Sequence, residues 1–397
     1  MNLRRLRSAA LQRAIYVIVS IVFFYYLTGR PTSQLELRRQ VTQRRTWIDC
    51  PMCCGEVSDI VQKFGPADEN LWCFDLDFID RKRQYYRNVT TFNAAFSYYL
   101  GMATRFLSDV GSKVPISQVI VWRIEDNATI QLKLARALTE KNIAVVGHSI
   151  VRSRVPFLQH YMTFVPNFHF IETRGFVNIL KKIREKGKRF EKRIPQVMWA
   201  GSITGTPCDG VRPCSNSCDD TKRIKLVRNF QGFSWLNLTL TSPHIDGQVV
   251  VRNREDCNCS VQKQISEESW AGYRGILDID GNVDAWGSRW RLESGCAHFQ
   301  VRSSFENYFS ARLVDGVHYV LLAADLSDLV QKTTIITSNE QRDSGYLTTL
   351  ATNARKVLKT ISYDDIVQEV GIKIREYQHL TVEHSKHNRF SELRNEL

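Results

Sequence analysis

Two arginines and two tryptophans stand close together in the run Trp286-Gly287-Ser288-Arg289-Trp290-Arg291. Arg289 and Arg291 are two positions apart, and the turn sequence Asp280-Gly281 precedes them. Guanidinium groups bind phosphate through paired hydrogen bonds and also stack on flat rings. The run is therefore suited to clamping a phosphate and holding a base, although a surface loop with solvated arginines has the same spacing.

A second candidate phosphate site is the small-residue run Gly201-Ser202-Ile203-Thr204-Gly205-Thr206. It directly follows the apolar run Gln196–Ala200, which reads as a strand. Small residues after a strand let backbone amides and hydroxyl groups approach a phosphate. The run matches neither a Walker loop nor G-x-G-x-x-G, so an ordinary strand-to-loop turn is the competing interpretation.

Two pairs of carboxylates, Asp75-x-Asp77 and Asp278-x-Asp280, fit the short acidic motif that holds Mn²⁺ on a nucleotide-sugar in many enzymes. Asp278 and Asp280 alternate with apolar residues on a predicted strand, which favours a structural role. Three histidines far apart in the sequence, His148, His169 and His318, make no metal signature. We therefore expect no metal cofactor.

The elements that position these residues follow a strand–helix rhythm that begins near residue 115. Short apolar runs predict buried strands, and apolar residues at helical spacing predict helices between them. The predicted strands are Gln118–Trp122, Ile143–Val146, Phe168–Ile171 and Gln196–Ala200; the predicted helices are Ile130–Lys141 and Phe176–Lys192. This alternation is typical of a parallel sheet with right-handed crossovers.

The second half repeats the rhythm after residues 205–265, which contain five cysteines and two glycosylation sequons and read as a decorated loop region. Gly275–Asp280 and Val317–Leu322 are predicted strands, and Ser327-Asp328 opens a helix. Ser362 and Asp365 resemble a capping box before an apolar stripe of Ile366, Val370, Ile374 and Tyr377. Two such α/β halves, joined near residue 195, predict two Rossmann-like domains facing a cleft.

The N-terminus indicates a compartment. Ala14–Gly29 carries no charge, and arginines lie on both sides of it. The run is shorter than the ~20 residues of a typical span, and no small-x-small cleavage site follows. We expect an uncleaved type II signal-anchor with the remaining chain in the lumen; a cleaved signal peptide is the alternative.

The remaining composition agrees with a lumenal location. Four sequons begin at Asn88, Asn127, Asn237 and Asn258, and we expect them to be glycan acceptors. For the ten cysteines, disulfides are favoured over zinc binding in an oxidising lumen. The net charge of +13 favours an anionic partner. Nucleic acid is excluded by the lumenal address, so the basic run Lys181–Arg193 is read as a solvated helix face.

The order of these motifs resembles a known family. The segment Tyr273–Leu329, with its Asp-Gly, aromatic-Ser-x-Arg and Asp-Leu-Ser-Asp-Leu elements, resembles the core of glycosyltransferase family 90, the capsule-associated and Rumi-like protein O-glucosyltransferase group. Trp199-Ala200-Gly201-Ser202, Val119–Arg123 and the helix ending Arg375-Glu376-Tyr377 resemble further elements of that family. The similarity spans roughly residues 115–380, and its specific part is the block 273–329.

The resemblance implies a GT-B fold and an inverting, metal-independent transfer of glucose or xylose from a UDP-sugar to a hydroxyl group of a protein or glycan. It implies that Arg289 and Arg291 neutralise the diphosphate and that Glu306 lies near the nucleoside. The other implied donor-binding residues are Gly201, Ser202, Thr204, Asp280, Trp286 and Ser288. Family members often have arginine where this chain has Ile203, and Arg223 or Arg228 is the expected replacement.

The family's catalytic base follows an arginine immediately, whereas here Ile124 separates Arg123 from two carboxylates. Glu125 and Asp126 are therefore rival bases, and we favour Asp126. A carboxylate at this position would deprotonate the acceptor hydroxyl. General-base catalysis of this kind typically increases the rate by about 10²–10⁴-fold.

The expected organisation is a cytoplasmic tail (1–13), a transmembrane anchor (14–29), a stem (30–55), an acceptor-side domain (56–195), a donor-binding domain (196–365) with the insertion 205–265, and a C-terminal helix (366–397) packing back on the first domain. The expected location is the Golgi or endoplasmic reticulum membrane. Two other functions remain open: a lumenal carbohydrate- or nucleotide-sugar-binding protein without turnover, and a metal-dependent transferase using one of the two acidic pairs.

Overall fold

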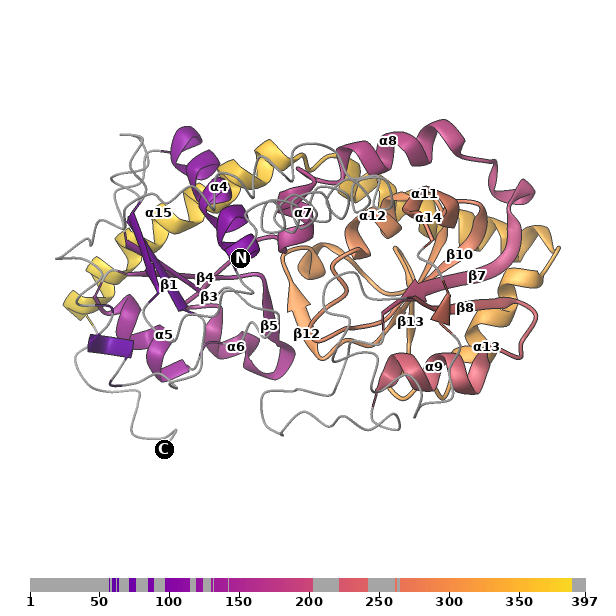
Figure 1. Cartoon of the computed structure of the whole chain (residues 1–397), viewed down its shortest axis with the longest axis horizontal. Helices are drawn as coiled ribbons and strands as arrows, with labels where there is room; N and C mark the ends of the chain where they lie inside the picture. Colours follow the sequence, from indigo (N-terminus) through magenta and orange to yellow (C-terminus); the bar gives the residue numbers. More distant parts are fainter. Residues whose placement is uncertain are drawn as a thin grey trace, which may run out of the picture. The chain divides into compact units, whose positions relative to one another are not determined.

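The computed structural model divides the chain into two compact units, Met1–Trp47 and Ile48–Leu397. It describes residues 57, 59–61, 63, 71–75, 85–88, 97–114, 119–123, 130, 132–141, 143–202, 221–241, 261–262 and 265–387, all within the second unit. These residues form an α/β structure with two separate main sheets, which we call the first sheet and the second sheet (Figure 1).

The first sheet has the strand order β2-β1-β3-β4-β6. Its strands are β1 (Leu71–Asp75), β2 (Tyr85–Asn88), β3 (Val119–Arg123), β4 (Ala144–Gly147) and β6 (Thr163–Phe164). β3, β4 and β6 are parallel; the apolar runs predicted β3 and β4, whereas β6 was not expected. β1 is antiparallel to both β2 and β3, so the expectation of a purely parallel sheet is wrong for this half.

Helices α4 (Ser97–Lys113), α5 (Leu132–Thr139) and α6 (Val155–Leu158) accompany the first sheet, with the turn η3 (Arg152–Arg154) leading into α6. In α5, Leu134 and Leu138 are buried, whereas Leu132 is 40% exposed. The α5 residues pack with Val121 and Val145 from the strands into one apolar cluster. Burial of this face stabilises a helix of only eight residues, which would be marginal alone.

The predicted strand Phe168–Ile171 is wrong, because these residues form the helix α7 (Phe168–Glu172). The side chain of Asn167 caps it by accepting a hydrogen bond from the amide of Phe170, at 3.0 Å. The next predicted helix is shorter than expected: α8 (Val177–Lys186) ends before the extended Gly187, and η4 (Phe190–Lys192) follows.

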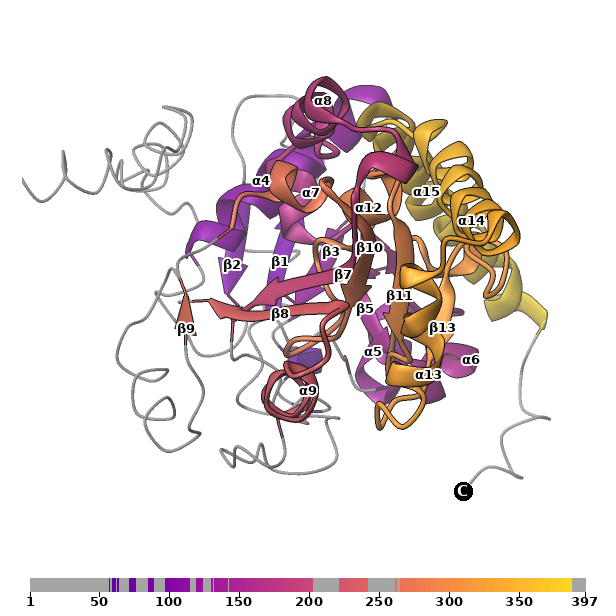
Figure 2. The same cartoon turned by 90° about the vertical axis from the view of Figure 1, so that its right-hand side faces the viewer.

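The second sheet has the strand order β13-β11-β10-β7-β8-β9, and every neighbouring pair is parallel. Figure 2 shows these strands side by side. They are β7 (Ile194–Gly201), β8 (Leu236–Thr241), β9 (Val261–Gln262), β10 (Tyr273–Asp278), β11 (Ala297–Val301) and β13 (Val320–Leu322). Helices α9 (Lys222–Phe230) and α12 (Ser288–Glu293) lie on opposite sides of β7 and β8 in both cartoons.

Two features of the second sheet differ from expectation. The region 205–265 is not only loop, because α9 and β8 lie in it and β8 pairs with β7 along five residues. The strand β11 was not expected, and the strand predicted at Val317–Leu322 is limited to Val320–Leu322. Short helical segments complete this half: α11 (Glu267–Trp270), η5 (Ser310–Arg312), α13 (Leu329–Thr333) and η6 (Thr334–Thr337).

One strand pair and the two C-terminal helices connect the halves. The strands β5 (Ser149–Val151) and β12 (Phe305–Asn307) form an antiparallel pair between the chain after β4 and the chain after β11. Helix α14 (Gln341–Lys359) packs on α12 and β11, and α15 (Tyr363–His387) packs on α4, β4 and β6. The capping box before α15 is confirmed, since Ser362 and Asp365 exchange hydrogen bonds.

No helix among the described residues is long and apolar enough to cross a membrane. The predicted anchor 14–29 lies outside the described residues. Cys296 is a buried free thiol whose Sγ lies 3.0 Å from Arg193 Nη1, so it takes no part in the disulfides expected for this chain.

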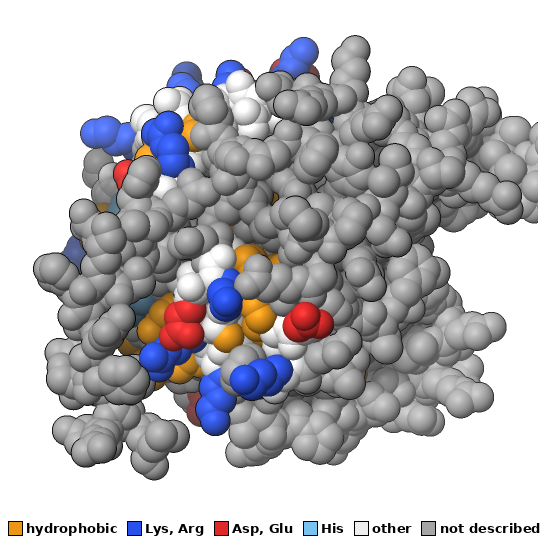
Figure 3. Space-filling view, turned by 90° about the vertical axis from the view of Figure 1, so that its left-hand side faces the viewer, with side chains coloured by type: hydrophobic (Ala, Val, Ile, Leu, Met, Phe, Trp, Pro, Cys, Tyr) orange, Lys and Arg blue, Asp and Glu red, His pale blue; other side chains and the backbone are white. Residues whose placement is uncertain are grey.

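On the face drawn in Figure 3, the described residues include side chains of both charges. Lys and Arg side chains lie beside Asp and Glu side chains around a small group of apolar atoms on that face. The basic run at α8 is exposed, as expected: Lys181, Lys182 and Lys186 all face solvent, and ion pairs with Glu185 and Glu268 engage two of them.

Candidate functional site

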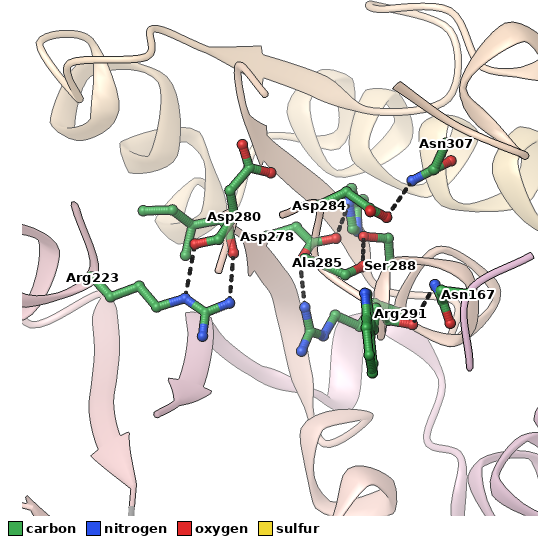
Figure 4. Close-up of polar contacts among 12 residues, drawn as sticks. Asn167, Arg223, Asp278, Asp280, Asp284, Ala285, Ser288, Arg291 and Asn307 are labelled. Atoms are coloured by element: carbon green, nitrogen blue, oxygen red, sulfur yellow. Dashed lines mark hydrogen bonds and ion pairs between the residues drawn. The ribbon is translucent and has the colours of Figure 1, made fainter. Parts of the chain in front are cut away.

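A small polar pocket lies at the carboxyl ends of β10 and β11. The carboxyl edge of a parallel sheet is where α/β folds bind their ligands. The pocket is lined by Asp278, Ile279, Asp280, Asp284, Ala285, Ser288, Gln300, Val301, Ser303, Phe305, Asn307 and Ser310. Figure 4 shows the polar contacts around it.

Asp278, the last residue of β10, is 2% exposed and already paired. Its Oδ1 accepts a hydrogen bond from Arg291, and its Oδ2 lies 3.5 Å from Nε2 of His298. Burial lowers the pKa of His298 to about 4, so this imidazole is neutral at pH 7. The guanidinium of Arg291 also lies over the rings of Trp270 and Trp290. Asp278 therefore holds Arg291 in place beneath the pocket.

The turn after β10 is fixed by Arg223, the second residue of α9. Its Nε donates to the carbonyl of Asp280 at 2.9 Å, and its Nη2 donates to the carbonyl of Ile279 at 3.1 Å. Its Nη1 lies 3.3 Å from the carbonyl of Ser202, at the end of β7. Arg223 therefore joins the carboxyl ends of two adjacent strands (Figure 4).

The carboxyl group of Asp280 lines the pocket beside Ser303. Burial raises the pKa of Asp280 to about 6, while the hydrogen bond from Ser303 and the charge of Lys222 act in the opposite direction. At pH 7 this side chain is mostly ionised and presents acceptor oxygens to the pocket.

Asp284 is the most deeply buried carboxyl group of the loop before α12, at 5% exposure. Its Oδ2 accepts a hydrogen bond from Nδ2 of Asn307 at 2.8 Å. Burial raises the pKa of Asp284 to about 7, against the hydrogen bond from Asn307. Asp284 is therefore ionised and protonated in comparable amounts near neutral pH.

The lining residues, all of which the structure describes, include three aspartates and no lysine or arginine. Three serines and two amide side chains supply the remaining polar groups. Such a surface repels a diphosphate but suits hydroxyl groups, which donate to carboxylates and accept from amides and serines. The geometry therefore favours a neutral, hydroxyl-rich ligand group in this pocket.

The structure brings some of the predicted donor-binding residues together here. Asp280 and Ser288 line the pocket, although the Ser288 hydroxyl also donates to the carbonyl of Ala285 at 2.6 Å. Gly201 and Ser202 end β7 and are joined to the pocket through Arg223. Position 201 requires glycine because the ring of Trp199 lies close to its Cα: a Cβ there would lie 2.8 Å from Trp199 Cζ2.

Arg289, which the resemblance assigns to the diphosphate, does not line the pocket. Its side chain is 4% exposed and forms an ion pair with Glu293, at 2.5 Å. Its Nη2 also donates to the carbonyls of Leu358, in the last turn of α14, and of Ile361, just after that helix, at 2.7 and 2.9 Å. The i,i+2 spacing places Arg289 and Arg291 on different faces of α12, and neither guanidinium lines the pocket.

Trp286 and Glu306 contact the first half of the chain instead of lining the pocket. The ring of Trp286 packs edge-on against Tyr99 and His148, with centroids 5.7 and 5.8 Å apart. Its carbonyl accepts a hydrogen bond from Asn167, at 3.3 Å. Glu306 forms an ion pair with Arg152 at 2.9 Å.

Several predicted residues cannot be placed. Glu125, Asp126 and Thr204 lie outside the described residues, as do the sequon asparagines Asn127 and Asn258. Asn88 lies in β2. Asn237 lies inside β8, where its Nδ2 donates to Tyr273 Oη at 2.9 Å and Thr239 of the same sequon is buried. The folded strand therefore does not present the Asn237 sequon as a glycan acceptor.

Sequence reasoning missed most of the lining. Ser303, Asn307 and Ser310 were not expected, because β11 and β12 were not recognised, and Asp284 in the loop before α12 was not expected either. The sequence offered one signal: the acidic residue Asp284 stands between two apolar residues, Val283 and Ala285, both of which are buried in the structure. Among the residues that the structure describes, no three His, Cys, Asp or Glu side chains are grouped so as to hold a metal ion. Asp77, the second residue of the first acidic pair, lies outside them.

Comparisons with known proteins find distant likenesses. No family model matches the chain. A curated relative, uncharacterized protein 179R of Invertebrate iridescent virus 6, is 24% identical over 173 residues, which cover 38% of this chain and only 14% of the viral protein.

Three solved structures are similar at low TM-score. Sucrose-phosphate synthase from Thermosynechococcus elongatus is 12% identical, with 63% of this chain and 62% of that chain covered and a TM-score of 0.38. HepE from Anabaena, solved in complex with UDP and glucose, is 11% identical over 70% and 75%, with a TM-score of 0.40. α,α-Trehalose 6-phosphate synthase from Burkholderia multivorans is 11% identical over 81% and 84%, also with a TM-score of 0.40. Likenesses at this level do not by themselves assign a fold family or an activity.

Proposed function

We propose that this protein is a UDP-sugar-dependent glycosyltransferase of the GT-B type, related to glycosyltransferase family 90. The observation that carries the proposal is the pocket at the carboxyl ends of β10 and β11. All of its lining residues belong to the segment Tyr273–Leu329, the part of the sequence that most resembles that family. Two α/β sheets connected through β5 and β12 agree with a fold of two Rossmann-like halves.

The chemistry of the pocket supports a sugar-bearing ligand. Carboxylates, amides and serine hydroxyls are the groups that recognise sugar or ribose hydroxyls. The diphosphate would bind outside this acidic lining, and the small-residue run after β7 is our candidate. Arg223 places a cationic group beside the first residues of that run, and burial lowers its pKa only to about 10, so it stays charged at pH 7.

The proposed reaction is an inverting transfer of glucose or xylose. An acceptor hydroxyl attacks the anomeric carbon, the new C–O bond forms as the bond to the UDP oxygen breaks, and a carboxylate takes the hydroxyl proton. Asp126, with Glu125 as its rival, is the proposed base, because both follow the carboxyl end of β3. The acceptor is a hydroxyl group of a protein or glycan, and no metal ion is required in this scheme.

A binding protein without turnover is the second candidate. The engagement of Arg289 and Arg291 favours it, because both guanidinium groups expected to neutralise the leaving diphosphate are held by carboxylates instead. Catalysis depends on stabilising the charge that develops on the leaving group, whereas binding of the ground state does not.

One experiment separates these functions. The purified chain is incubated with a panel of UDP-sugars without acceptor, and released sugar and UDP are measured beside equilibrium binding of the same compounds. Turnover of one UDP-sugar supports the transferase, and binding without turnover supports the second candidate. Asp126→Asn should lower turnover by about 10²-fold or more with unchanged UDP affinity. Glu125→Gln is the matched variant. Activity abolished by EDTA and restored by Mn²⁺ would instead select the metal-dependent scheme.

We further propose that residues 14–29 anchor the protein in the Golgi or endoplasmic reticulum membrane with its C-terminus in the lumen. The charge distribution around this run supports the orientation. A C-terminal tag in sealed microsomes should resist protease until detergent is added. A tag digested without detergent would contradict this topology.

A further inference from the structure

We propose that Asp284 binds a hydroxyl group of the nucleotide-sugar and so determines which hydroxyl pattern the pocket accepts. The proposal rests on the proposed function for the identity of the ligand.

The first observation is an unsatisfied acceptor. Oδ2 of Asp284 accepts from Asn307, but Oδ1 is buried and accepts no hydrogen bond from the part of the chain that the structure describes. A buried carboxylate oxygen without a partner is unfavourable, and native structures rarely leave one in that state. Asp284 also lines the pocket, so a ligand entering the pocket can supply the missing donor.

The second observation is a serine hydroxyl on the other side of this carboxyl group. The Ser149 hydroxyl lowers the pKa of Asp284 as a hydrogen-bond donor. Ser149 belongs to β5 and is paired in register with Asn307 of β12. Two donors from one strand pair therefore face Asp284, and a carboxylate can accept a further hydrogen bond from a ligand hydroxyl.

The third observation is that Asp284 is held in one orientation. Oδ1 of Asn307 accepts from the amide of Phe309 at 2.9 Å and from the hydroxyl of Ser310 at 3.2 Å. These donors fix the amide so that its Nδ2 must point at Asp284. The neighbouring Asp278 also has one buried oxygen without a hydrogen-bond partner among the described residues, but its charge is compensated by the ion pair with Arg291, whereas no ion pair within the described part of the chain compensates Asp284.

Two parts of a nucleotide-sugar carry suitable hydroxyls: the ribose and the transferred sugar. Their shared chemistry is a pair of vicinal hydroxyls. Asp284 can serve either, because burial raises its pKa to about 7 and its carboxyl group therefore accepts or donates a hydrogen bond near neutral pH.

The test is equilibrium binding of UDP, 2′,3′-dideoxy-UDP, UDP-glucose and UDP-xylose to the purified full chain. The variants are Asp284→Ala and Asp284→Asn. The second keeps the size of the side chain and the hydrogen bond from Asn307, but it places an amide NH₂ donor where Oδ1 of Asp284 lies. Asp364→Asn, at an exposed carboxylate in the first turn of α15, is the matched control. Circular dichroism and thermal unfolding identify variants that do not fold.

We expect both Asp284 variants to raise the Kd of the two UDP-sugars by about 10-fold or more, because each loses a hydrogen bond to a charged group. The control variant should leave the Kd unchanged. If UDP affinity is unchanged, the hydroxyl belongs to the transferred sugar. If the Kd of UDP rises as much as that of the UDP-sugars, and the Kd of dideoxy-UDP does not change, the hydroxyl belongs to the ribose.

Unchanged binding of every ligand to a folded Asp284→Asn would overturn this inference alone. Binding that requires Mn²⁺ would also overturn it, because the carboxylates would then hold a cation. No binding of any ligand to the unmodified chain would contradict the proposed function as well.

Discussion

Arg289 shows how the environment of a single residue decides its role. In the sequence it is one of two arginines in a candidate phosphate loop, but in the structure it neutralises the buried Glu293 and donates to two carbonyls at the C-terminal end of α14. Burial lowers the pKa of Arg289 to about 10 and raises the pKa of Glu293. The pair is therefore an internal ion pair, and removing one partner leaves an uncompensated buried charge.

We predict that Arg289→Ala destabilises the protein by about 3–5 kcal/mol. Chemical denaturation followed by fluorescence measures the change. The double variant Arg289→Met/Glu293→Leu is the control, because it removes both charges and should recover most of the loss. A stable Arg289→Ala variant with weakened UDP binding would show instead that Arg289 reaches the ligand.

The raised pKa of Asp284 predicts a pH dependence of stability. The folded pKa of about 7 lies above the ordinary value of 3.8, so the folded state binds this proton more tightly than the unfolded state. The stabilisation is complete below about pH 4 and is lost as the pH rises to about 7. This contribution to the free energy of unfolding is on the order of a few kcal/mol in total, and it is absent in Asp284→Asn.

The measurement is the free energy of unfolding of both proteins at pH values from 4 to 8. Asp280 also has a raised pKa and titrates in the same direction, so only the difference between the two proteins reports on Asp284. A difference that does not change between pH 4 and pH 7 would place the pKa of Asp284 near its ordinary value.

At the scale of elements, the crossing of α15 over α4 depends on Gly371. A Cβ at this position would lie 2.7 Å from Cγ2 and 2.8 Å from Cβ of Val114. We predict that Gly371→Ala destabilises the protein by about 1–3 kcal/mol through overpacking, although alanine is the better helix former. Gly345→Ala in α14 is the control, since a Cβ there meets nothing within 4 Å and should stabilise by about 0.5–1 kcal/mol. Thermal unfolding compares them; equal shifts would mean that α15 does not pack closely at Gly371.

The elements that sequence predicted correctly are those with a strong local signal. β3, β4, β7 and β10 each contain a short apolar run, which is the signal of a buried parallel strand. Phe168–Ile171 has the same appearance, yet Asn167 caps it as a helix, and a run of four residues does not distinguish the two. β8 was missed because its alternating Leu-Asn-Leu-Thr-Leu-Thr pattern stands within a region rich in cysteine and sequons.

At the scale of the whole molecule, the candidate site depends on contacts between segments far apart in the sequence. Ser149 and Asn307 face one another only because β5 pairs with β12, and Arg223 reaches Asp280 from α9. No local pattern carries this information. The sequence could therefore predict the strand ends and the Asp280 turn, but not that Asp284 and Asn307 complete the pocket while Arg289 turns away from it.

The central claim, that the pocket at the ends of β10 and β11 holds part of a UDP-sugar, is tested most directly by a crystal structure of the chain with UDP-glucose or UDP-xylose. We predict ligand hydroxyls within hydrogen-bond distance of Asp280 or Asp284, and the diphosphate beside the run that follows Gly201. A ligand bound elsewhere, with this pocket filled only by water, would contradict the account.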